Sequence, residues 1–580
     1  MGIQSLTKHV LPYAETVVLD GSPSKTDLPP CVRSVVIDGP SLVYHVYYKL
    51  LAWSDLICDK IDPQPTCDQV SRGVASCLLQ LKGRGIKIHG IFFDGALPIS
   101  KRGVRLDRIE KSRQRLELSR QRTFPLAPEG RPKQKSLQPL QFWQNRSLPS
   151  RLRRLPENPF MVAAVYEDLK QRWSTKQMAI DFQLNALQLQ GEEYPWAGIT
   201  AMVPGEADFD CARISKLTGA AVLTDDSDLV VHDLGPRGAV VLLKSLHLLD
   251  STLDQVSTEI RGLRISLSGL SNRPGIKDIQ RFAYELTQNP QHGLSDLVRR
   301  ANEDLGTCER TLDYHKFIQE YQGCQHDFVD DDQPLSSQQR VNDLTLDPRV
   351  SELFWQYERP KIYCRGQNVQ PHVYMGILSE DHSRRCAWEQ GRMYRALGYS
   401  ILNQSYPEPS RFPVIQEFVR RGGRIVAEEI TLCGAKTIAS DLDIFHTRLK
   451  LAQTVFGDMT QPRFWVMFAI SEIWRNCSNH ATLPNAANLE HFLKHGYTTD
   501  QAEWSDLHLA SQIQAVLYSL RILKQLLGVT NDLPCSCHQS ILSGLPPLHI
   551  LLGSRHEMTQ EFLGDDMAHR SVYQLIQTYS

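Results

Sequence analysis

Acidic residues gather in one stretch, residues 203–233, in a pattern that could hold divalent metal ions. Glu206 and Asp208 open a helix-like run, and Asp225, Asp226 and Asp228 follow the apolar segment AAVLT. Burying several charges of one sign in a hydrophobic core costs free energy. Mg²⁺, in contrast, prefers hard carboxylate oxygens as ligands and keeps several waters. The stretch therefore predicts part of a metal site, to which other acids of the N-terminal half would contribute.

These other acids follow strands that the sequence predicts. Apolar runs predict strands at 33–38, 87–93, 199–203, 220–224 and 239–243, and helical patterns at 68–82, 161–190 and 206–218 separate most of them. Strands that alternate with helices indicate an α/β fold with a parallel, doubly wound sheet. The acids that then lie just after four strand ends are Asp38, Asp94, Glu206, Asp208, Asp226 and Asp228.

The carboxyl edge of such a sheet is where open α/β folds bind ligands, so the six acids are expected to share one crevice. The alternative is that each Asp forms a strand-end turn, for which Asp is favoured in any case. That alternative is the better explanation of any single residue, but it does not explain six acids at four successive strand ends. Asp225 is expected to be a neighbour of the site and not a ligand.

A basic tract separates the second and third predicted strands. Residues 101–154 contain sixteen Lys/Arg and four Asp/Glu, whereas the whole chain has a net charge of −1. The first part is compatible with a helix, and prolines exclude a continuous helix in the second. A basic tract beside a carboxylate crevice suits a polyanion whose phosphates are led to metal ions. The alternatives are a solvated insertion loop and a localisation signal.

The remaining length predicts further units. A chain of 580 residues is too long for one core, and its composition, with 41% apolar and 22% charged residues, is that of a globular protein. We expect a domain at 1–245, with a basic insertion at 101–160, and a helical extension at 246–302. A polar linker is expected at 303–345 and a mostly α-helical region at 346–580.

The cysteines and the hydropathy of the chain indicate in which cellular compartment the protein is expected. Thirteen cysteines without paired Cys-x-x-Cys sets, and no signal peptide, predict reduced intracellular thiols. The one cysteine cluster, Cys535-Ser-Cys537-His538, has the wrong spacing for an ordinary zinc site. No apolar run approaches the roughly 20 residues that a membrane span needs. We therefore expect a soluble intracellular protein without membrane contact.

Several blocks of this sequence resemble the flap-endonuclease/XPG nuclease family, within the wider PIN-like fold. They are most similar to the Asteroid branch and its fungal XPG-domain relatives. The blocks are the opening MGIQSL, then VVIDGPSLVYHVYY, IFFDGALPISKRGVRLDRIEKSR, PGEADFDCA and TDDSD. The resemblance covers roughly residues 1–245 and implies a nuclease that hydrolyses phosphodiester bonds.

The resemblance also implies roles for particular residues. Two Mg²⁺ or Mn²⁺ ions would be held by the six acids named above, and Lys101 and Arg108 would contact the scissile phosphate. Tyr44 would stack on the substrate, Gly2 would lie near the active site, and the basic insertion would correspond to the arch that admits single strands. The predicted nucleic-acid contacts are Gly2, Tyr44, Arg102, Arg105, Lys111, Arg113, Arg151, Arg153 and Arg154.

The expected substrate is branched or single-stranded nucleic acid, with DNA favoured over RNA, in DNA repair and in the nucleus. Two departures from the family pattern bear on activity. Asp208 stands where the family has Glu, and Ser271 falls where active members carry a seventh acid. In SGLSNRPGIKDIQRFAYEL, Asp278 and Gln280 replace glycines of the helix-two-turn-helix that grips duplex DNA.

Two alternatives to an active nuclease remain open at this point. The first is a nucleic-acid-binding or scaffold protein on a nuclease fold with weakened catalysis, as the two departures suggest. The second is a protein-interaction module whose working part is the helical region 346–580, with a protein partner. The retained six acids favour the nuclease, because an abandoned metal site would gain stability by losing mutual repulsion.

Overall fold

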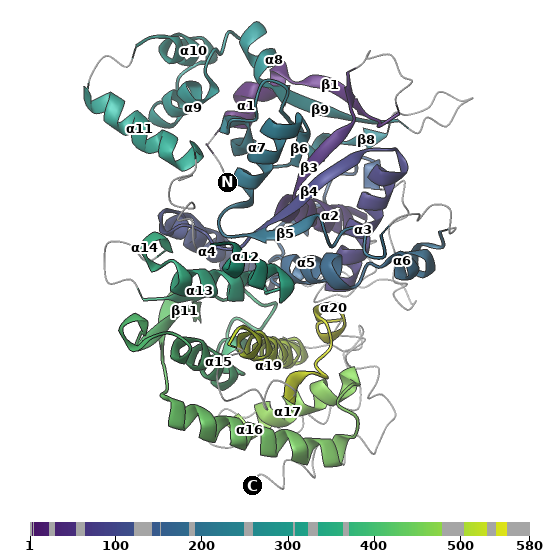
Figure 1. Cartoon of the computed structure of the whole chain (residues 1–580), viewed down its shortest axis with the longest axis vertical. Coiled ribbons are helices and arrows are strands. Elements are labelled where there is room, and N and C mark those ends of the chain that lie inside the picture. The colour runs from purple at the N-terminus through teal and green to yellow at the C-terminus, as the bar shows by residue number, and fades with distance from the viewer. Residues whose placement is uncertain are drawn as a thin grey trace.

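The computed structural model places a large mixed sheet in the N-terminal half and a smaller sheet with long helices in the C-terminal half (Figure 1). The residues that the structure describes are 3, 5–22, 30–53, 64–120, 142–150, 152–184, 192–248, 259–304, 308–322, 334–363, 370–477, 504–530 and 541–553. The cysteine cluster at 535–538 lies outside them. Within the described part of the chain, no helix is both long and apolar enough to cross a membrane.

The large sheet confirms the α/β class. Its strand order is β2-β1-β9-β7-β6-β3-β4-β5, with β8 paired to β9, and the five strands from β7 to β5 are parallel. The strands are β1 Glu15–Leu19, β2 Cys31–Val32, β3 Ser34–Asp38, β4 Lys87–Asp94, β5 Thr200–Val203, β6 Ala221–Thr224, β7 Ala239–Leu242, β8 His247–Leu248 and β9 Ile260–Ser266. The five parallel strands are those that the sequence predicted.

Alternating apolar side chains give the sheet two covered faces. In β3, Val35 and Ile37 join one hydrophobic cluster, and Val36 joins the other. The first face is covered by α2 Gly39–Trp53, α3 Cys67–Gly83 and α5 Met161–Gln171. The second is covered by α1 Leu6–Val10, α7 Ala207–Thr218 and α9 Ile279–Gln288. This doubly wound arrangement places the strand ends of β3, β4, β5 and β6 side by side.

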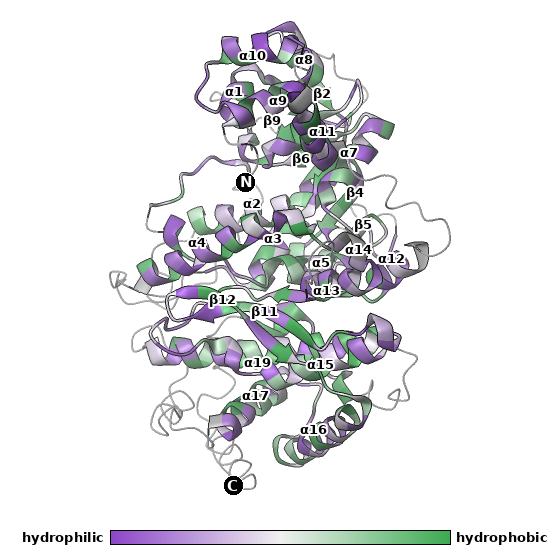
Figure 2. Ribbon diagram, turned by 90° about the vertical axis from the view of Figure 1, so that its left-hand side faces the viewer, coloured by the Kyte–Doolittle hydropathy of each residue, from purple (hydrophilic) through white to green (hydrophobic). Residues whose placement is uncertain are grey.

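The C-terminal half contains strands as well as the expected helices. A sheet of order β10-β11-β12 consists of β10 His372–Tyr374, β11 Val414–Arg421 and β12 Arg424–Thr431. The helices are α13 Pro348–Glu358, α14 Pro360–Tyr363, α15 Arg392–Gln404, α16 Ala435–Phe456, α17 Pro462–Cys477, α19 Trp504–Val529 and α20 Leu548–Leu551. In Figure 2 the green, hydrophobic stretch of β11 faces α15 and α19. We call this half, residues 346–553, the C-terminal lobe.

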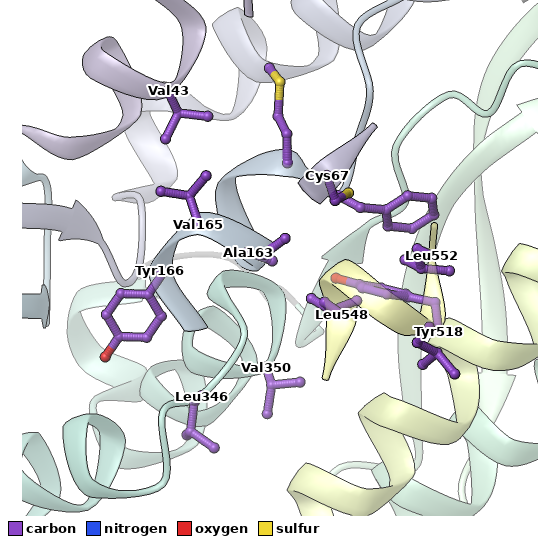
Figure 3. Close-up of a cluster of buried hydrophobic side chains, with 14 of the residues drawn as sticks. Val43, Cys67, Ala163, Val165, Tyr166, Leu346, Val350, Tyr518, Leu548 and Leu552 are labelled. Carbon is purple, nitrogen blue, oxygen red and sulfur yellow. The ribbon is translucent and has the colours of Figure 1, made fainter. Parts of the chain in front are cut away.

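One hydrophobic core runs through both halves. Side chains of α5, such as Ala163 and Val165, lie between Val43 of α2 and the C-terminal residues Val350 and Leu548 (Figure 3). Polar contacts reinforce the junction, because Glu167 of α5 accepts hydrogen bonds from Arg521 at 2.7 Å and from the backbone N–H of Leu548 at 2.8 Å. The C-terminal lobe therefore packs on the helical layer of the N-terminal half.

The segment expected as a linker, 303–345, contains two helices, α11 Cys308–Gln322 and α12 Pro334–Asp343. These helices pack against the rest of the protein, because they bury the side chains of Ile318, Tyr321 and Val341. The predicted helix at 161–190 is divided into α5 and α6 Thr175–Phe182, because Ser174 caps a new start by accepting from the N–H of Gln177. The region 246–302 contains β8 and β9 together with α8 Leu267–Asn272, α9 and α10 Leu294–Asn302.

Candidate metal centre and nucleic-acid interface

The ends of four parallel strands bring the predicted acids to one edge of the sheet. Asp38 is the last residue of β3 and Asp94 the last of β4. Glu206 precedes α7 just beyond β5, and Asp208 lies in the first turn of that helix. Asp226 follows β6 and caps the short 3-10 helix Ser227–Val231, which contains Asp228. All six acids therefore lie at one edge of the sheet, and we call them the acidic cluster.

Hydrogen bonds hold the carboxylates in place. Asp38 accepts from the hydroxyl of Thr224 at 2.7 Å and from the backbone N–H of Ser41 at 3.3 Å. Asp94 accepts from the N–H of Ala207 at 2.8 Å, at the start of α7. Each strand-end acid is thus tied to the neighbouring strand or helix.

The two acids after β6 are linked to each other and to the start of the chain. Asp226 accepts from the N–H of Asp228 at 2.9 Å, and Asp228 accepts from the N–H of Ile3 at 2.7 Å. Gly2 itself lies outside the described residues, but its neighbour Ile3 therefore contacts the acidic cluster.

Burial and mutual repulsion disfavour the charged forms of these acids. Burial first, and the neighbouring Asp94 second, raise the pKa of Asp38 to about 7. Burial likewise raises the pKa of Glu206 to about 7 and that of Asp228 to about 6, and it holds the pKa of Asp208 well above its usual range. Asp226 is a repelling neighbour of each of the other five acids. It is the centre of the cluster.

The chemistry of this donor set suits a divalent cation, although the side chains do not converge on one point. Oε1 of Glu206 is buried without a hydrogen-bond partner, and Nζ of Lys101 lies 3.7 Å from it. Among the described residues, no group of three or more His, Cys, Asp or Glu side chains is arranged to hold a metal ion. Hard oxygens with uncompensated repulsion fit Mg²⁺ or Mn²⁺ chemically, and closing them around an ion requires side-chain rotation.

The fifth acid of the stretch, Asp225, is bound elsewhere. Its Oδ1 accepts from the backbone N–H of Lys244 at 2.8 Å, and its Oδ2 lies 3.4 Å from Nδ1 of His45. Asp225 is consequently a neighbour whose carboxylate is already paired, and it provides a matched control for Asp226.

The basic helix α4, Arg102–Arg120, follows the acidic cluster closely. Lys101, immediately before it, interacts electrostatically with Glu206 first and also with Asp228 and Asp208. The positive charges of Arg105 and Arg108 oppose the burial that raises the pKa of Asp94. Lys101 and Arg108 are therefore placed near the acids, as the two predicted phosphate contacts require.

The other predicted nucleic-acid contacts divide into two groups. Three of the arginines contact other side chains of the protein. Arg102 makes a cation–π contact, Arg105 makes an ion pair, and Arg113 pairs with Glu110 at 2.7 Å and with Glu117 at 2.5 Å. Lys111, Arg153 and Arg154 are exposed residues, and Tyr44 is 37% exposed. Arg151 lies outside the described residues. The sequence did not distinguish the engaged arginines from the exposed basic side chains.

Helix α11 brings two residues to the cluster that the sequence analysis missed. Tyr321 is buried, with its ring 5.5 Å from that of His232 and 4.9 Å from that of Phe317. Burial and the nearby Asp228 raise the pKa of Tyr321, and Glu320 beside it acts electrostatically on Lys101 and Glu206. The spacing of Phe317 and Tyr321, four residues apart, was the available signal for an apolar helix face.

The expected duplex-binding element has an acid at its helix start. Asp278 caps α9, accepting from the N–H groups of Gln280 at 2.9 Å and Arg281 at 3.0 Å. Gly275 has a φ of 78°, and its carbonyl accepts from the side chain of Asn302 at 3.1 Å. A helix start attracts anions through its free N–H groups, and here the Asp278 carboxylate already occupies two of them.

We expect the metal-free protein to lose stability as the pH rises from about 5 to about 8. The raised pKa values of Asp38, Glu206 and Asp228 mean that the native state binds more protons than the unfolded chain in this range. The free energy of unfolding then falls with pH, by up to about 1.4 kcal/mol per pH unit for each titrating group. Urea unfolding in EDTA at each pH measures this dependence.

The matched variants for this measurement are Asp226→Asn, which should flatten the pH dependence, and Asp225→Asn, which should leave it unchanged. Addition of Mg²⁺ at pH 8 should raise the unfolding midpoint of the native sequence. A free energy of unfolding that increases between pH 5 and pH 8 in EDTA would contradict the prediction.

The fold and this edge define the class of the molecule: an α/β protein with an acidic cluster at the carboxyl end of a parallel sheet. Residues 157–432 match the family model described as XPG domain containing. This region of the chain, a little under half of its length, is therefore similar to XPG-domain proteins. The matched region extends from α5 to β12, so it includes the small sheet of the C-terminal lobe as well as part of the large sheet.

Two further comparisons complete this result. No curated protein matches the chain. A solved structure described as the catalytic core of Rad2 in complex with DNA substrate is similar over 65% of this chain and 91% of that chain, with 15% sequence identity and a TM-score of 0.27. A similarity at that level supports no further inference.

Proposed function

We propose that this chain is a divalent-metal-dependent nuclease that hydrolyses phosphodiester bonds in branched or single-stranded nucleic acid. One observation carries the proposal: six acids, among them Asp226, gather at four strand ends, and the basic residues Lys101 and Arg108 lie beside them. The match of residues 157–432 to the family model described as XPG domain containing supports the same proposal. The family resemblance favours DNA over RNA, and together with the basic tract it favours the nucleus over the cytoplasm.

In this proposal the carboxylates of the acidic cluster hold the ions, and the basic side chains handle the phosphate. Bound Mg²⁺ or Mn²⁺, with two ions expected, would supply a Lewis acid and an activated water. Lys101 would offset the charge that develops on the phosphate, because its ammonium group lies beside the acidic cluster, 3.7 Å from Oε1 of Glu206. Arg108 approaches the phosphate from the exposed side of α4, and the partly exposed Tyr44 ring offers a surface on which a base can stack.

The weakened alternative, a nucleic-acid-binding protein without efficient catalysis, is favoured by a specific observation. The Asp278 carboxylate caps the N-terminus of α9 by accepting a backbone N–H. Ser271, which is exposed, lies where active members of the family that the sequence resembles have a further acid. This alternative predicts binding that is equally tight in EDTA and in variants of the acidic cluster, with an affinity that falls steeply as salt increases.

A time course of cleavage decides between the two. The full chain is incubated with flap, branched and single-stranded DNA and RNA, in Mg²⁺, in Mn²⁺ and in EDTA. Cleavage that needs metal supports the nuclease and identifies its substrate. Binding without cleavage on every substrate, unaffected by EDTA, would overturn the nuclease in favour of the binding protein.

Replacement of Lys101 by alanine is expected to lower kcat by about 100-fold to 1,000-fold with a much smaller effect on substrate affinity. The reason is that a positive group aimed at developing charge acts mainly in the transition state. Lys111→Ala is the matched control, because Lys111 is exposed on the same helix and farther along it. Single-turnover rates and fluorescence-anisotropy binding measure the two effects; equal losses of kcat in both variants would contradict the assignment.

A further inference from the structure

Helix α4 is attached to the rest of the protein mainly through arginines. Among its described side chains only Arg113 and Leu116 are buried, whereas Val104, Asp107, Arg108 and Lys111 are exposed. The helix lies along the C-terminal sheet and contacts β12 (Figure 2). A helix with so little apolar surface needs specific partners to keep one position.

Two arginines one turn apart on α4 rest on a pair of stacked rings in the C-terminal sheet. The Tyr374 and Phe418 rings are 4.8 Å apart and inclined by 15°. The guanidinium of Arg105 lies 4.3 Å from the Tyr374 ring centroid, and that of Arg102 lies 5.0 Å from the Phe418 ring centroid. Residues i and i+3 share a helix face, so both arginines meet the rings at once.

A buried carboxylate completes this contact. Glu352 of α13, which is 4% exposed, pairs with Arg105 at 2.5 Å. Tyr374 is anchored in turn, because its backbone carbonyl accepts from Nε of Arg349 at 3.1 Å. The C-terminal lobe thus holds the first turns of α4 through one ion pair and two cation–π contacts, which are stronger where they are removed from water.

The held segment is the part of α4 that adjoins the acidic cluster. Lys101 directly precedes Arg102, and its ammonium lies 3.7 Å from Glu206. Arg105 and Arg108 both act on Asp94. Movement of the first turns of α4 would therefore displace Lys101 and Arg108 from the acids.

We propose that Glu352, Tyr374 and Phe418 are positioning residues, through which the C-terminal lobe holds α4 so that Lys101 and Arg108 face the acidic cluster before any substrate binds. This inference rests on the proposed function, because it assigns a purpose to the C-terminal lobe in phosphate handling. It also assigns Arg102 and Arg105 to the protein's own scaffold, and it leaves phosphate contact beside the acidic cluster to Lys101 and Arg108.

The test compares Glu352→Gln with Glu380→Gln in the full chain. Glu380 is the matched control, because it is also a buried Glu of the C-terminal lobe paired with an Arg, here Arg420 at 2.9 Å, and its other ion pair is with His508 and not with an α4 residue. A second pair, Tyr374→Ala and Tyr374→Phe, removes or keeps the ring. Hydrogen exchange of residues 102–116 reports the position of α4, and single-turnover cleavage reports its consequence.

Glu352→Gln and Tyr374→Ala are expected to accelerate exchange in α4 at least tenfold and to lower kcat at least tenfold, with KM changed less than threefold. Glu380→Gln and Tyr374→Phe should leave α4 exchange as in the native sequence. Unchanged α4 exchange in Glu352→Gln, or the same acceleration in Glu380→Gln, would overturn the inference. Hydrogen exchange in α4 can be measured whether or not the protein cleaves nucleic acid. A native protein without cleavage would overturn the proposed function, and the exchange data would still decide whether the C-terminal lobe holds α4.

Discussion

The variant Asp226→Asn is expected to lose cleavage by about a thousandfold or more, equivalent to about 4 kcal/mol of the activation barrier. The charge of Asp226 acts on each of the other five acids, so Asp226 lies among them and is well placed to share any bound ion. Asparagine keeps the side-chain oxygen that caps Ser227–Val231, so the local fold should survive. Single-turnover cleavage with saturating Mg²⁺ measures the loss.

The same substitution should make the metal-free protein more stable, because it removes a negative charge from a group of like charges. Loss of activity together with a gain of stability is the signature that separates a functional carboxylate from a structural one. Thermal unfolding in EDTA, beside the cleavage assay, gives both numbers for one variant.

Asp225→Asn is the control for Asp226→Asn. Its carboxylate lies one residue away in the sequence but is bound to the N–H of Lys244 and faces His45. We expect cleavage within a fewfold of the native rate and no gain of stability in EDTA. Preserved cleavage in Asp226→Asn, or an equal loss in Asp225→Asn, would contradict the assignment of the acidic cluster.

The acidic cluster could be predicted because its signal is local. A strand such as 34–38 is a short apolar run, and the acid that ends it is the next polar residue. Parallel pairing then brings the ends together whatever the loops do. The missed strands carry weaker signals: β9, IRGLRIS, mixes arginines and a glycine with its apolar residues and pairs antiparallel with β1 and β7. Such strands are specified by their partners more than by their own pattern.

The division of the basic tract could not be predicted for a different reason. Arg105 and Arg108 are three residues apart in one basic helix, and composition treats them alike. One is paired with Glu352, almost 250 residues later in the chain, and the other is exposed. Only long-range packing distinguishes an arginine that attaches the helix from one that can meet a phosphate. The position of α11 beside the acidic cluster depends on tertiary contacts of the same kind.

The shared core also changes how the C-terminal lobe can be studied. A truncation near residue 320 would be the simplest test of a separate interaction module. It would, however, remove Leu346, Val350 and Leu548 from the core that also contains Val165 of α5 (Figure 3). Loss of function after such a truncation would report unfolding. Point variants at the junction are therefore the informative experiment.

Glu167→Ala is expected to lower the free energy of unfolding by about 3–5 kcal/mol, because removing one partner of a buried ion pair leaves the other charge without its hydrogen-bonded counterion. Glu167 accepts from Arg521 at 2.7 Å and from the N–H of Leu548, and the Arg521 side chain is only 5% exposed. The nearest remaining acid, Asp347, is 3.8 Å from Arg521. Urea unfolding followed by intrinsic fluorescence measures the change.

Asp233→Ala is the matched control, because Asp233 pairs with Lys216 at 2.6 Å but both side chains are more than half exposed. An exposed pair contributes at most about 1 kcal/mol. If the two halves form one cooperative unit, Glu167→Ala should shift a single unfolding transition for probes in both halves. Two transitions, with only the C-terminal one shifted, would contradict the shared core and make the C-terminal lobe a separable domain.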